Sequence, residues 1–507
     1  MYRLKMEVVT AIAAWAFATA SQLLPRSTDG LDGLCSQQDD LKALGDRLSS
    51  TAKVYCPGST GFTNATTRWS VLDEPEVNIV VVPGTENDVA EIVQFANQKD
   101  IPFLTYNGVH GALISLGEMT HGIAIYMGQL SSVKVAEDGK TATMGGGTMS
   151  KVVTDELWAA GKQTVTGTCE CVSLVGPALG GGHGWLQGHH GLVLDQFVSM
   201  NIVLANGTLT TLDATSDLWW AVKGAGHNFG IVTSLTMKVY EIQHRDWAIE
   251  TLTFSGDKVE QVYRAANNYL VKNGTQPAGV INWSYWMNIV DVDPTNPVIV
   301  FYIIQEGVTA VNSTYTEPFH KIGPLAVESN SGTYKDLAAW TEIAVTSPPC
   351  QKMGMANPRY PIYMKSYDVA AQQKAWDLYA NATRGSSAFN NSIFMFEGYS
   401  VEGVHDIDSR SSAFAFRSEN LLAAPMINYY PNGTELDRRA ANLGQELRNI
   451  LFKGTGRDDI RAYVNYAHGD ETPQQLYGSE KWRQQRLRAL KAKYDPTGKF
   501  SYYAPVP

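Results

Sequence analysis

Three glycine-rich segments are the first candidates for chemistry in this sequence, at residues 106–111, 167–184 and 223–232. Dense glycines let the backbone approach a ligand closely, and successive N–H groups form a nest that binds a pyrophosphate without a lysine. The longest segment contains no lysine or arginine, which suits such a nest. Three nests predict a long, extended ligand, and flexible loops without a ligand are the alternative.

The sequence gives less support to other common enzyme motifs and to a metal site. The sequence has no GxxxxGK[ST], HExxH, GxSxG or GxGxxG motif, which disfavours P-loop, zincin, hydrolase and simple Rossmann enzymes. Cys169 and Cys171 lie near His183, His189 and His190, but their spacing does not match a tetrahedral zinc site. We therefore expect no metal.

The first half of the chain predicts a mixed α+β region over residues 70–245. Thr85 and Asp88 form a capping box between two β-branched runs, which indicates a βαβ-type unit. Gly161 is the expected C-cap of a second helix. Strands are expected at residues 78–82, 102–106, 141–144 and 230–240, helices at 85–96 and 150–160, and a hairpin at 198–212.

The second half predicts a large antiparallel sheet. Alternating strands are expected at residues 247–254, 279–289, 298–305, 392–399 and 424–430. Helices at 258–271 and 435–452 would cover one face, which leaves the other face free to roof a ligand. A further strand is expected at 461–466, followed by a last helix at 480–494.

These segments together resemble the FAD-linked oxidases of the berberine bridge enzyme group, within the vanillyl-alcohol oxidase superfamily. The resemblance rests on the three glycine segments and on residues 217–220, 413–417, 463–466, 495–496 and 500, in that order. It implies an α+β fold with a two-part, PCMH-type FAD-binding domain and a substrate domain whose antiparallel sheet is covered by helices on one face.

The same resemblance implies a domain division. After a signal peptide at residues 1–20, the FAD-binding domain would span 21–245 with its core at 70–245. The substrate-binding domain would span 246–455. A C-terminal segment at 456–507 would return to the FAD domain.

The resemblance also implies an extended FAD with two candidate tethers, its pyrophosphate lying on the first two glycine segments. His110 matches the histidine that bonds the flavin 8α carbon, and Cys169 matches the cysteine that bonds C6. One departure affects His110, because Val109 replaces a glycine of the family and a β-branched residue resists positive φ. The implied cofactor-binding residues are Asn107, Gly108, Val109, His110, Gly111, Cys169, Val172, Gly176, Gly180, Gly181, Gly182, Gly230, Val232 and Asn465.

For the catalytic base, the resemblance points to Tyr466, with Tyr463 in reserve. A tyrosine with an ordinary pKa near ~10 needs help from charge or hydrogen bonding to act near neutrality. The glutamate base of berberine bridge enzyme itself matches Asn428 here, which cannot be a base, so a glutamate mechanism is disfavoured. Val172 matches the position that gates oxygen, in its oxidase form. His227 and Arg417 are expected to be structural or near the substrate.

The composition and charge of the chain indicate which kinds of partner to expect. The 507 residues carry 40 Lys+Arg and 50 Asp+Glu, a formal charge of −10, and no basic block of the kind that binds nucleic acid. Arg3 and Lys5 precede an apolar run too short to span a bilayer, which predicts a secretory signal peptide. We expect a secreted protein without stable membrane insertion, and leave the oligomeric state open, with a monomer acceptable.

The cysteines and the N-glycosylation sequons also fit the secretory pathway. Cys35 and Cys56 are expected to form a disulfide, while the pairing of Cys169, Cys171 and Cys350 is open. N-glycosylation sequons occur at Asn64, Asn206, Asn273, Asn282, Asn312, Asn381, Asn390 and Asn432.

The function expected from these observations is that of an FAD-dependent oxidase acting on a small molecule with O2 as electron acceptor. A secondary-metabolite intermediate, oxidised at an alcohol or cyclised oxidatively, is favoured. An oligosaccharide oxidase acting at the anomeric hydroxyl is the alternative, and a non-redox flavoprotein cyclase or binding protein is a third.

Overall fold

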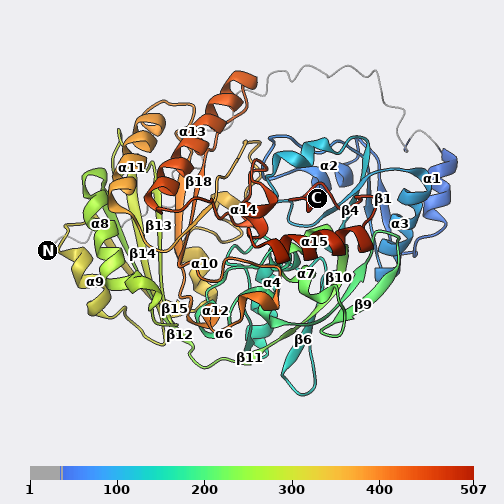
Figure 1. Cartoon of the computed structure of the whole chain (residues 1–507), viewed down its shortest axis with the longest axis horizontal. Helices are drawn as coiled ribbons and strands as arrows, with labels where there is room; N and C mark the ends of the chain where they lie inside the picture. Colours follow the sequence, from blue (N-terminus) through green and yellow to red (C-terminus); the bar gives the residue numbers. More distant parts are fainter. Residues whose placement is uncertain (1–34, 36–37) are drawn as a thin grey trace.

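The computed structural model describes Cys35 and residues 38–507, and these residues form three large β-sheets and one two-stranded sheet (Figure 1). The expected signal peptide, residues 1–20, lies outside the described residues. Within the described part of the chain, no helix is both long and apolar enough to cross a membrane.

The first sheet has four strands, and its βαβ character is confirmed. β4 (Gly122–Tyr126) runs parallel to its two neighbours, and the capping box of Thr85 and Asp88 starts α3 as expected. The apolar stripe of α3 is buried against the sheet. The other elements are α3 (Glu86–Lys99), β1 (Lys53–Tyr55), β2 (Val77–Val82) and β3 (Phe103–Tyr106).

The second sheet has five antiparallel strands and completes the first region. The expected hairpin is present as β8 (Phe197–Val203) and β9 (Leu209–Asp213). Helix α4 (Ser150–Ala159) is followed by Gly161 at φ +72°, as a C-terminal glycine cap requires. The other strands are β5 (Val133–Val135), β6 (Thr141–Gly145) and β10 (Ile231–Lys238), and a separate pair is β7 (Lys162–Gln163) with β11 (Tyr240–Glu241).

The third sheet has seven antiparallel strands in the order β15-β12-β14-β13-β17-β18-β16. All five expected strands are present, although the last begins three residues earlier than expected. The edge strands β15 and β16 were not expected. The bounds are β12 (Asp246–Ser255), β13 (Val280–Met287), β14 (Val298–Glu306), β15 (Ala326–Thr333), β16 (Ile362–Met364), β17 (Ile393–Gly398) and β18 (Leu421–Met426).

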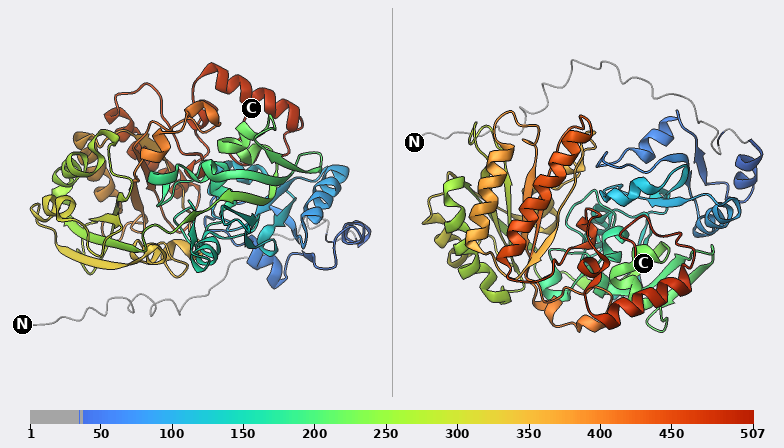
Figure 2. Two further views of the ribbon diagram at one scale, coloured as in Figure 1. Left: turned by 90° about the horizontal axis from the view of Figure 1, so that it is seen from below. Right: turned by 45° about the horizontal axis from the view of Figure 1, so that its top comes forward.

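Helices cover one face of this third sheet, as expected. α8 (Val259–Ala265), α11 (Val369–Thr383) and α13 (Thr434–Gly454) lie side by side on it (Figure 2). Their apolar side chains enclose Trp286, Phe394 and Phe396 of the sheet. Because strand side chains alternate between faces, Tyr285, Met395 and Glu397 point to the other face, toward the first region.

The end of the chain returns to the first region. α15 (Lys481–Tyr494) packs there, and the Lys491 ammonium donates to the Asn228 carbonyl at 3.0 Å. The strand expected at 461–466 is wrong. Residues 464–466 form a 3₁₀ turn closed by the Tyr466 N–H on the Tyr463 carbonyl at 2.9 Å, so the backbone turns within the segment instead of extending.

The remaining helices are short connections. They are α1 (Gln38–Gly45), α2 (Thr60–Thr66), α5 (Val175–Leu179), α6 (Gln187–His190), α7 (Trp219–Ala225), α9 (Ser313–His320), α10 (Leu337–Trp340), α12 (Glu402–His405) and α14 (Pro473–Tyr477).

Two disulfides are present in the described residues. The expected Cys35–Cys56 bond is confirmed, and Cys171 bonds Cys350. Among the sequons, Asn282 is wrong as a glycosylation site, because its side chain is 0% exposed and hydrogen bonded inside β13. The other seven asparagines are exposed.

Candidate functional site

The three glycine segments meet in the structure. A Cβ on Gly108 would lie 2.8 Å from the Cys171 carbonyl, so the first and second segments touch there. His227 Nε2 lies 2.8 Å from the Gly176 carbonyl, which joins the third segment to the second. The Asn107 amide also donates to the Gly146 carbonyl at 3.2 Å. Gly146 belongs to a glycine triplet at 145–147 that is not among the three expected segments.

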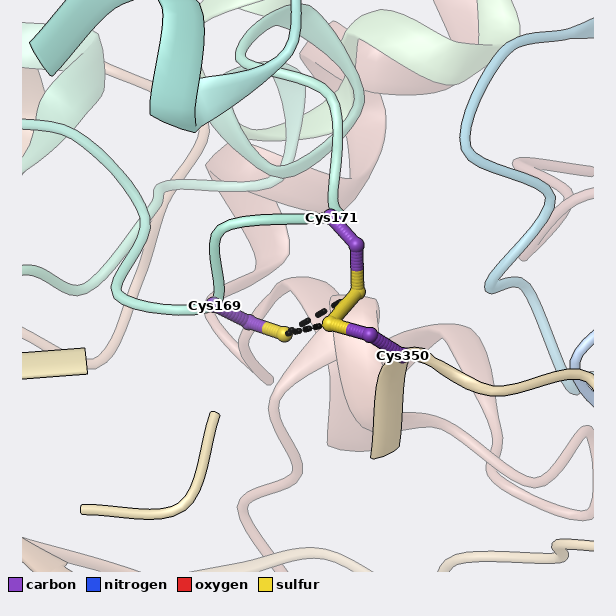
Figure 3. Close-up of side chains that lie close together, drawn as sticks. All are labelled: Cys169, Cys171 and Cys350. Carbon is purple, nitrogen blue, oxygen red and sulfur yellow. Dashed lines mark hydrogen bonds between the residues drawn. A yellow bond between two sulfur atoms is a disulfide. The ribbon is translucent and has the colours of Figure 1, made fainter. Parts of the chain in front are cut away.

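Three sulfur atoms gather beside these segments (Figure 3). Cys171 and Cys350 are disulfide bonded, and Cys169 is the free thiol, with its Sγ 3.6 and 3.8 Å from theirs. Metal ions bind cysteine as thiolate, and the disulfide removes two of the three thiolates. The disulfide leaves Cys169 as the free thiol of the cluster. Burial raises the pKa of that thiol to about 11, so it is protonated near pH 7.

His110 lies next to the sulfur cluster. Its Nε2 is 3.4 Å from Cys171 Sγ, and its ring stacks on Trp69 with centroids 5.4 Å apart. Burial, followed by the charges of Arg359, Lys352 and Arg68, lowers the pKa of His110 to about 3. The imidazole is therefore neutral near pH 7. With Nε2 against sulfur, Nδ1 is the nitrogen available as a nucleophile.

Val109 shows how the loop accommodates its departure from the family pattern. Its φ is +61°, although β-branched residues rarely adopt that region. The side chain is buried against Tyr106, Val80 and Val82, and the Val109 carbonyl accepts from the Trp69 N–H at 3.2 Å. Packing thus holds a strained backbone, and the loop presents His110 despite the valine.

Tyr463 and Asn465 hold the glycine triplet at 180–182. The Tyr463 hydroxyl accepts from the N–H groups of Gly182 and His183 at 3.2 and 3.3 Å, and from the Asn465 amide at 2.7 Å. A Cβ on Gly180 would lie 2.2 Å from Asn465 Oδ1, so only glycine fits there. With these three donors on its oxygen, Tyr463 holds the backbone of the glycine triplet, and its role as reserve base stays a prediction.

Tyr466 has a different partner. Its hydroxyl donates to Glu397 Oε1 at 2.8 Å, and the Arg359 guanidinium lies over its ring, 4.6 Å from the centroid. Burial raises the pKa of Glu397 to about 7, despite hydrogen bonds from Tyr466 and Tyr399. Burial and the Glu397 charge hold the pKa of Tyr466 well above its usual value.

A sheet glutamate that is not among the expected site residues, Glu397, lies beside Tyr466. Asn428, which the resemblance matches to the family's glutamate, follows β18, and its N–H donates to Ser392 Oγ at 3.1 Å. Glu397 lies on β17, in the run Ile-Phe-Met-Phe-Glu-Gly. The alternation of that strand places Glu397 opposite Phe396, on the face without helices, and this signal was present in the sequence.

The other expected site residues pack against several different parts of the fold. Gly111 packs on Tyr503, and Val172 lies in the turn that follows Cys169, where its carbonyl accepts from the Ser150 N–H. Gly230 and Val232 lie at the start of β10, packed on β8 and Gly146 respectively. Arg417 makes a buried bidentate ion pair with Asp195, which assigns it a structural role.

The residues around the glycine segments fit a flavin. Buried polar atoms normally have hydrogen-bond partners. Asn465 Oδ1, Arg359 Nε, Ser150 Oγ and His227 Nδ1 are buried without one in the described part of the chain. Gly181 and Gly182 have φ of +121° and +81°, which side chains rarely adopt. A long polar ligand would supply partners to these atoms.

Burial shifts the pKa values of five side chains around the glycine segments. Burial lowers the pKa of His183 and of His227 to about 4, as it shifts those of His110, Cys169 and Tyr466. All five side chains nevertheless remain partly accessible to solvent. Cys169 and Tyr466 pack against the core cluster that joins the first region to the face of the seven-stranded sheet that carries no helices, called the open face below.

Comparison with known proteins identifies the family of the chain. A family model described as an FAD binding domain matches residues 77–213, and one described as berberine and berberine like matches residues 462–507. The FAD-linked oxidoreductase chyH of Penicillium rubens is 60% identical over 503 residues, covering 99% of this chain and 100% of the relative.

Two solved structures show the fold. BBE-like 1 of Physcomitrella patens has a TM-score of 0.78 and 20% identity, over 92% of this chain and 99% of its own. Glucooligosaccharide oxidase of Acremonium strictum, described with a 6-S-cysteinyl, 8α-N1-histidyl FAD, has a TM-score of 0.76 and 17% identity, over 92% and 98%. The chain is thus an FAD-linked oxidoreductase of the berberine bridge enzyme-like family.

Proposed function

We propose that the protein is an oxidase that removes two electrons from a small organic substrate and passes them to O2, yielding hydrogen peroxide. Bound FAD supplies the hydride acceptor and the reaction with O2. The observation that carries the proposal is the buried Tyr466–Glu397 hydrogen bond on the open face of the sheet, opposite the glycine segments.

The pair can remove a proton where either residue alone is poorly suited. Tyr466 alone stays protonated near pH 7, because its pKa is raised, and a protonated phenol cannot act as a base. Ionised Glu397 can accept the hydroxyl proton of Tyr466 across their 2.8 Å hydrogen bond while Tyr466 takes a proton from a substrate hydroxyl. Since the pKa of Glu397 is raised to about 7, the carboxylate is half ionised near neutrality and becomes fully ionised at higher pH.

We propose that His110 and Cys169 both bond the flavin. His110 is neutral with Nδ1 available, and Cys169 is the free cysteine of the described residues. The related fold of the Acremonium strictum enzyme carries FAD through both residue types, which supports the proposal. The remaining cofactor contacts would come from the glycine segments, with Asn465 Oδ1 as an acceptor and Val172 beside the oxygen path.

The substrate proposal is a secondary-metabolite intermediate, oxidised at an alcohol or cyclised oxidatively. Trp69, Ala112 and Met426 form a small apolar cluster with Ile393 and Met395 beside His110. An apolar cluster beside His110 suits an apolar or aromatic substrate better than a sugar, whose hydroxyls need polar partners. An oligosaccharide oxidase is the second candidate, because the fold matches glucooligosaccharide oxidase.

We also propose passage through the secretory pathway, with N-glycans on some of the seven exposed asparagines. Two disulfides support an oxidising compartment.

Peroxide release tests the oxidase proposal. A panel of aromatic alcohols, nitrogen-containing metabolites and oligosaccharides is screened for O2 consumption with matching peroxide. Tyr466→Phe should lower turnover by about 10² or more with flavin still bound. Tyr379→Phe is the matched control, because that buried tyrosine bonds the Trp286 and Ser392 carbonyls on the helix-covered side. Turnover without O2 consumption would instead identify a non-redox cyclase.

Acid precipitation tests the tethers. Flavin should remain on peptides containing His110 and Cys169, and Cys169→Ala should leave only the His110 peptide labelled. A fully released flavin would remove both covalent assignments without affecting FAD binding itself.

A further inference from the structure

Arg359 occupies an unusual place in the site. Its guanidinium carbon lies 4.6 Å from the centroid of the Tyr466 ring and 5.0 Å from that of Trp69. Nη2 donates to the His110 and Asn465 carbonyls at 3.4 and 3.3 Å, near the upper limit for a hydrogen bond. The side chain is 9% exposed. A cation is thus held between two aromatic faces, beside both the flavin loop and the Tyr466 turn.

The charge of Arg359 lacks a direct carboxylate partner. Arg417 and Arg448, which are also buried, have carboxylate oxygens of Asp195 and Asp470 at 2.6 Å. Arg359 makes no such ion pair in the described part of the chain, and its Nε has no hydrogen-bond partner. A buried charge is costly unless an opposite charge compensates it. The Tyr466–Glu397 pair is the anionic group that its guanidinium faces.

We propose that Arg359 is the positioning residue that makes Tyr466 usable as a base, by stabilising its phenolate through the face of the ring. This role rests on the proposed function of the Tyr466–Glu397 pair. With Glu397 ionised, the three side chains together are neutral. When the Tyr466 proton moves to Glu397, the negative charge moves from the carboxylate to the phenolate, next to the guanidinium. The phenolate then accepts the proton of the substrate hydroxyl.

Electrostatics support the proposed direction. The Arg359 charge lowers the pKa of Tyr466 and of Glu397, against the larger effect of burial. In return, Tyr466 and Glu397 favour the charged form of Arg359, whose pKa burial lowers. The other titratable groups that interact with these three side chains are Tyr285, Tyr363, Tyr399, Tyr463, Tyr503, Cys169 and His110. Burial raises the pKa of the tyrosines and of Cys169 and lowers that of His110, so all seven are neutral near pH 7.

Direct titration of residue 466 tests the proposal without a substrate. The purified flavoprotein is prepared with 2,3,5-trifluorotyrosine at position 466, because fluorination brings ionisation of the phenol into an accessible pH range, and is followed by ¹⁹F NMR. Arg359→Gln retains a hydrogen-bond donor but not the charge, and should raise the apparent pKa of the fluorotyrosine by about one unit, the order expected for one charge at this distance. Arg359→Lys should restore most of the shift.

The titration has a matched control, Arg68→Gln, and a second variant, Arg359→Met. Arg68→Gln removes another buried cation, which lies over Tyr106 and donates to the Gly111 carbonyl, and should leave the titration of residue 466 unchanged within about 0.3 unit. If Arg359→Gln misfolds by circular dichroism, Arg359→Met is titrated instead. An unchanged titration in folded Arg359→Gln or Arg359→Met overturns the role of Arg359.

Turnover and titration together distinguish failure of the proposed function from failure of the Arg359 proposal. If Tyr466→Phe retains full turnover while Arg359→Gln still shifts the titration, the electrostatic coupling stands but Tyr466 is not the base. If Tyr466→Phe loses turnover and the titration does not move, the base stands and Arg359 is excluded.

Discussion

The two faces of the seven-stranded sheet differ residue by residue along the same strands. On β13, Trp286 faces the helices and Tyr285 faces the flavin region, and on β17, Phe396 and Glu397 divide in the same way. The helix-covered face is a closely packed aromatic cluster whose Tyr263 hydroxyl bonds Ser284 and Trp286. The open face carries Glu397, hydrogen bonded to Tyr466 at 2.8 Å, and its apolar residues belong to the core cluster shared with the first region.

This difference separates stability from chemistry within one element. Residues one apart in a strand share backbone hydrogen bonds but belong to different surroundings. Substitutions on the helix-covered face should therefore change the free energy of unfolding, and substitutions on the open face should change turnover.

The largest effect expected from this comparison is on the open face. Glu397→Gln keeps the shape and a hydrogen-bonding group, but cannot accept the Tyr466 proton. We expect kcat to fall by about 10²–10⁴, the usual contribution of general base catalysis. The melting temperature should not fall, because a buried carboxylate with a raised pKa gives way to a neutral amide. Stopped-flow flavin reduction with a substrate from the peroxide screen measures the loss. Full activity would place the base elsewhere.

Phe396→Ala is the matched substitution one residue away. Phe396 is 0% exposed and contacts Trp286, Phe394 and Tyr263, so truncation should cost about 3–5 kcal/mol of stability. Urea unfolding would show the shift, while kcat per folded, flavin-loaded molecule should remain within about twofold, because the position does not face the site. A comparable kcat loss in both variants would contradict the division of the faces.

The pH dependence sharpens the assignment of Glu397. Its pKa is raised to about 7, so the ionised, proton-accepting form is lost as the pH falls through 7. kcat/KM should drop about tenfold per pH unit below that value, and Glu397→Gln should abolish this limb. An acid limb that persists in the variant would belong to another group.

Val109→Gly gives the smallest expected effect. Glycine relieves the cost of φ +61° but loses the buried valine side chain, and the two changes oppose each other. We expect the stability to change by less than about 1 kcal/mol. Val82→Gly, in the same cluster but in an ordinary strand, loses packing without relief and should cost more. Equal losses, measured by thermal unfolding, would show that Val109 is not strained.

Sequence reasoning found elements with strong local signals. The capping box of α3, the hairpin at β8 and β9 and the long alternating strands were predicted because periodicity and turn residues determine them locally. The edge strand β15 was missed, since Ala-Val-Glu-Ser-Asn-Ser-Gly-Thr is mostly exposed and polar. Its partner is β12, which is distant in sequence, and that pairing defines it.

The site was predicted in part. The structure brings His110, Cys169 and Tyr466 to one place, whereas Glu397 and Arg359 were not singled out. Glu397 could have been found, because a charged residue interrupts an otherwise apolar strand. Arg359 could not, since nothing local distinguishes it and its position over Tyr466 depends on contacts across more than one hundred residues.

The Cys171–Cys350 disulfide has a consequence for a nicked molecule. It closes a loop of 179 residues that includes β8 to β15, and it ties the cysteine-bearing turn of the first region to the segment after β15. A protease that cuts an exposed turn inside this loop, such as residues 291–296, would leave two polypeptides still joined through sulfur. The fragments would migrate together until a reductant is added, so a cut in the backbone at this turn would not by itself separate the two parts of the protein.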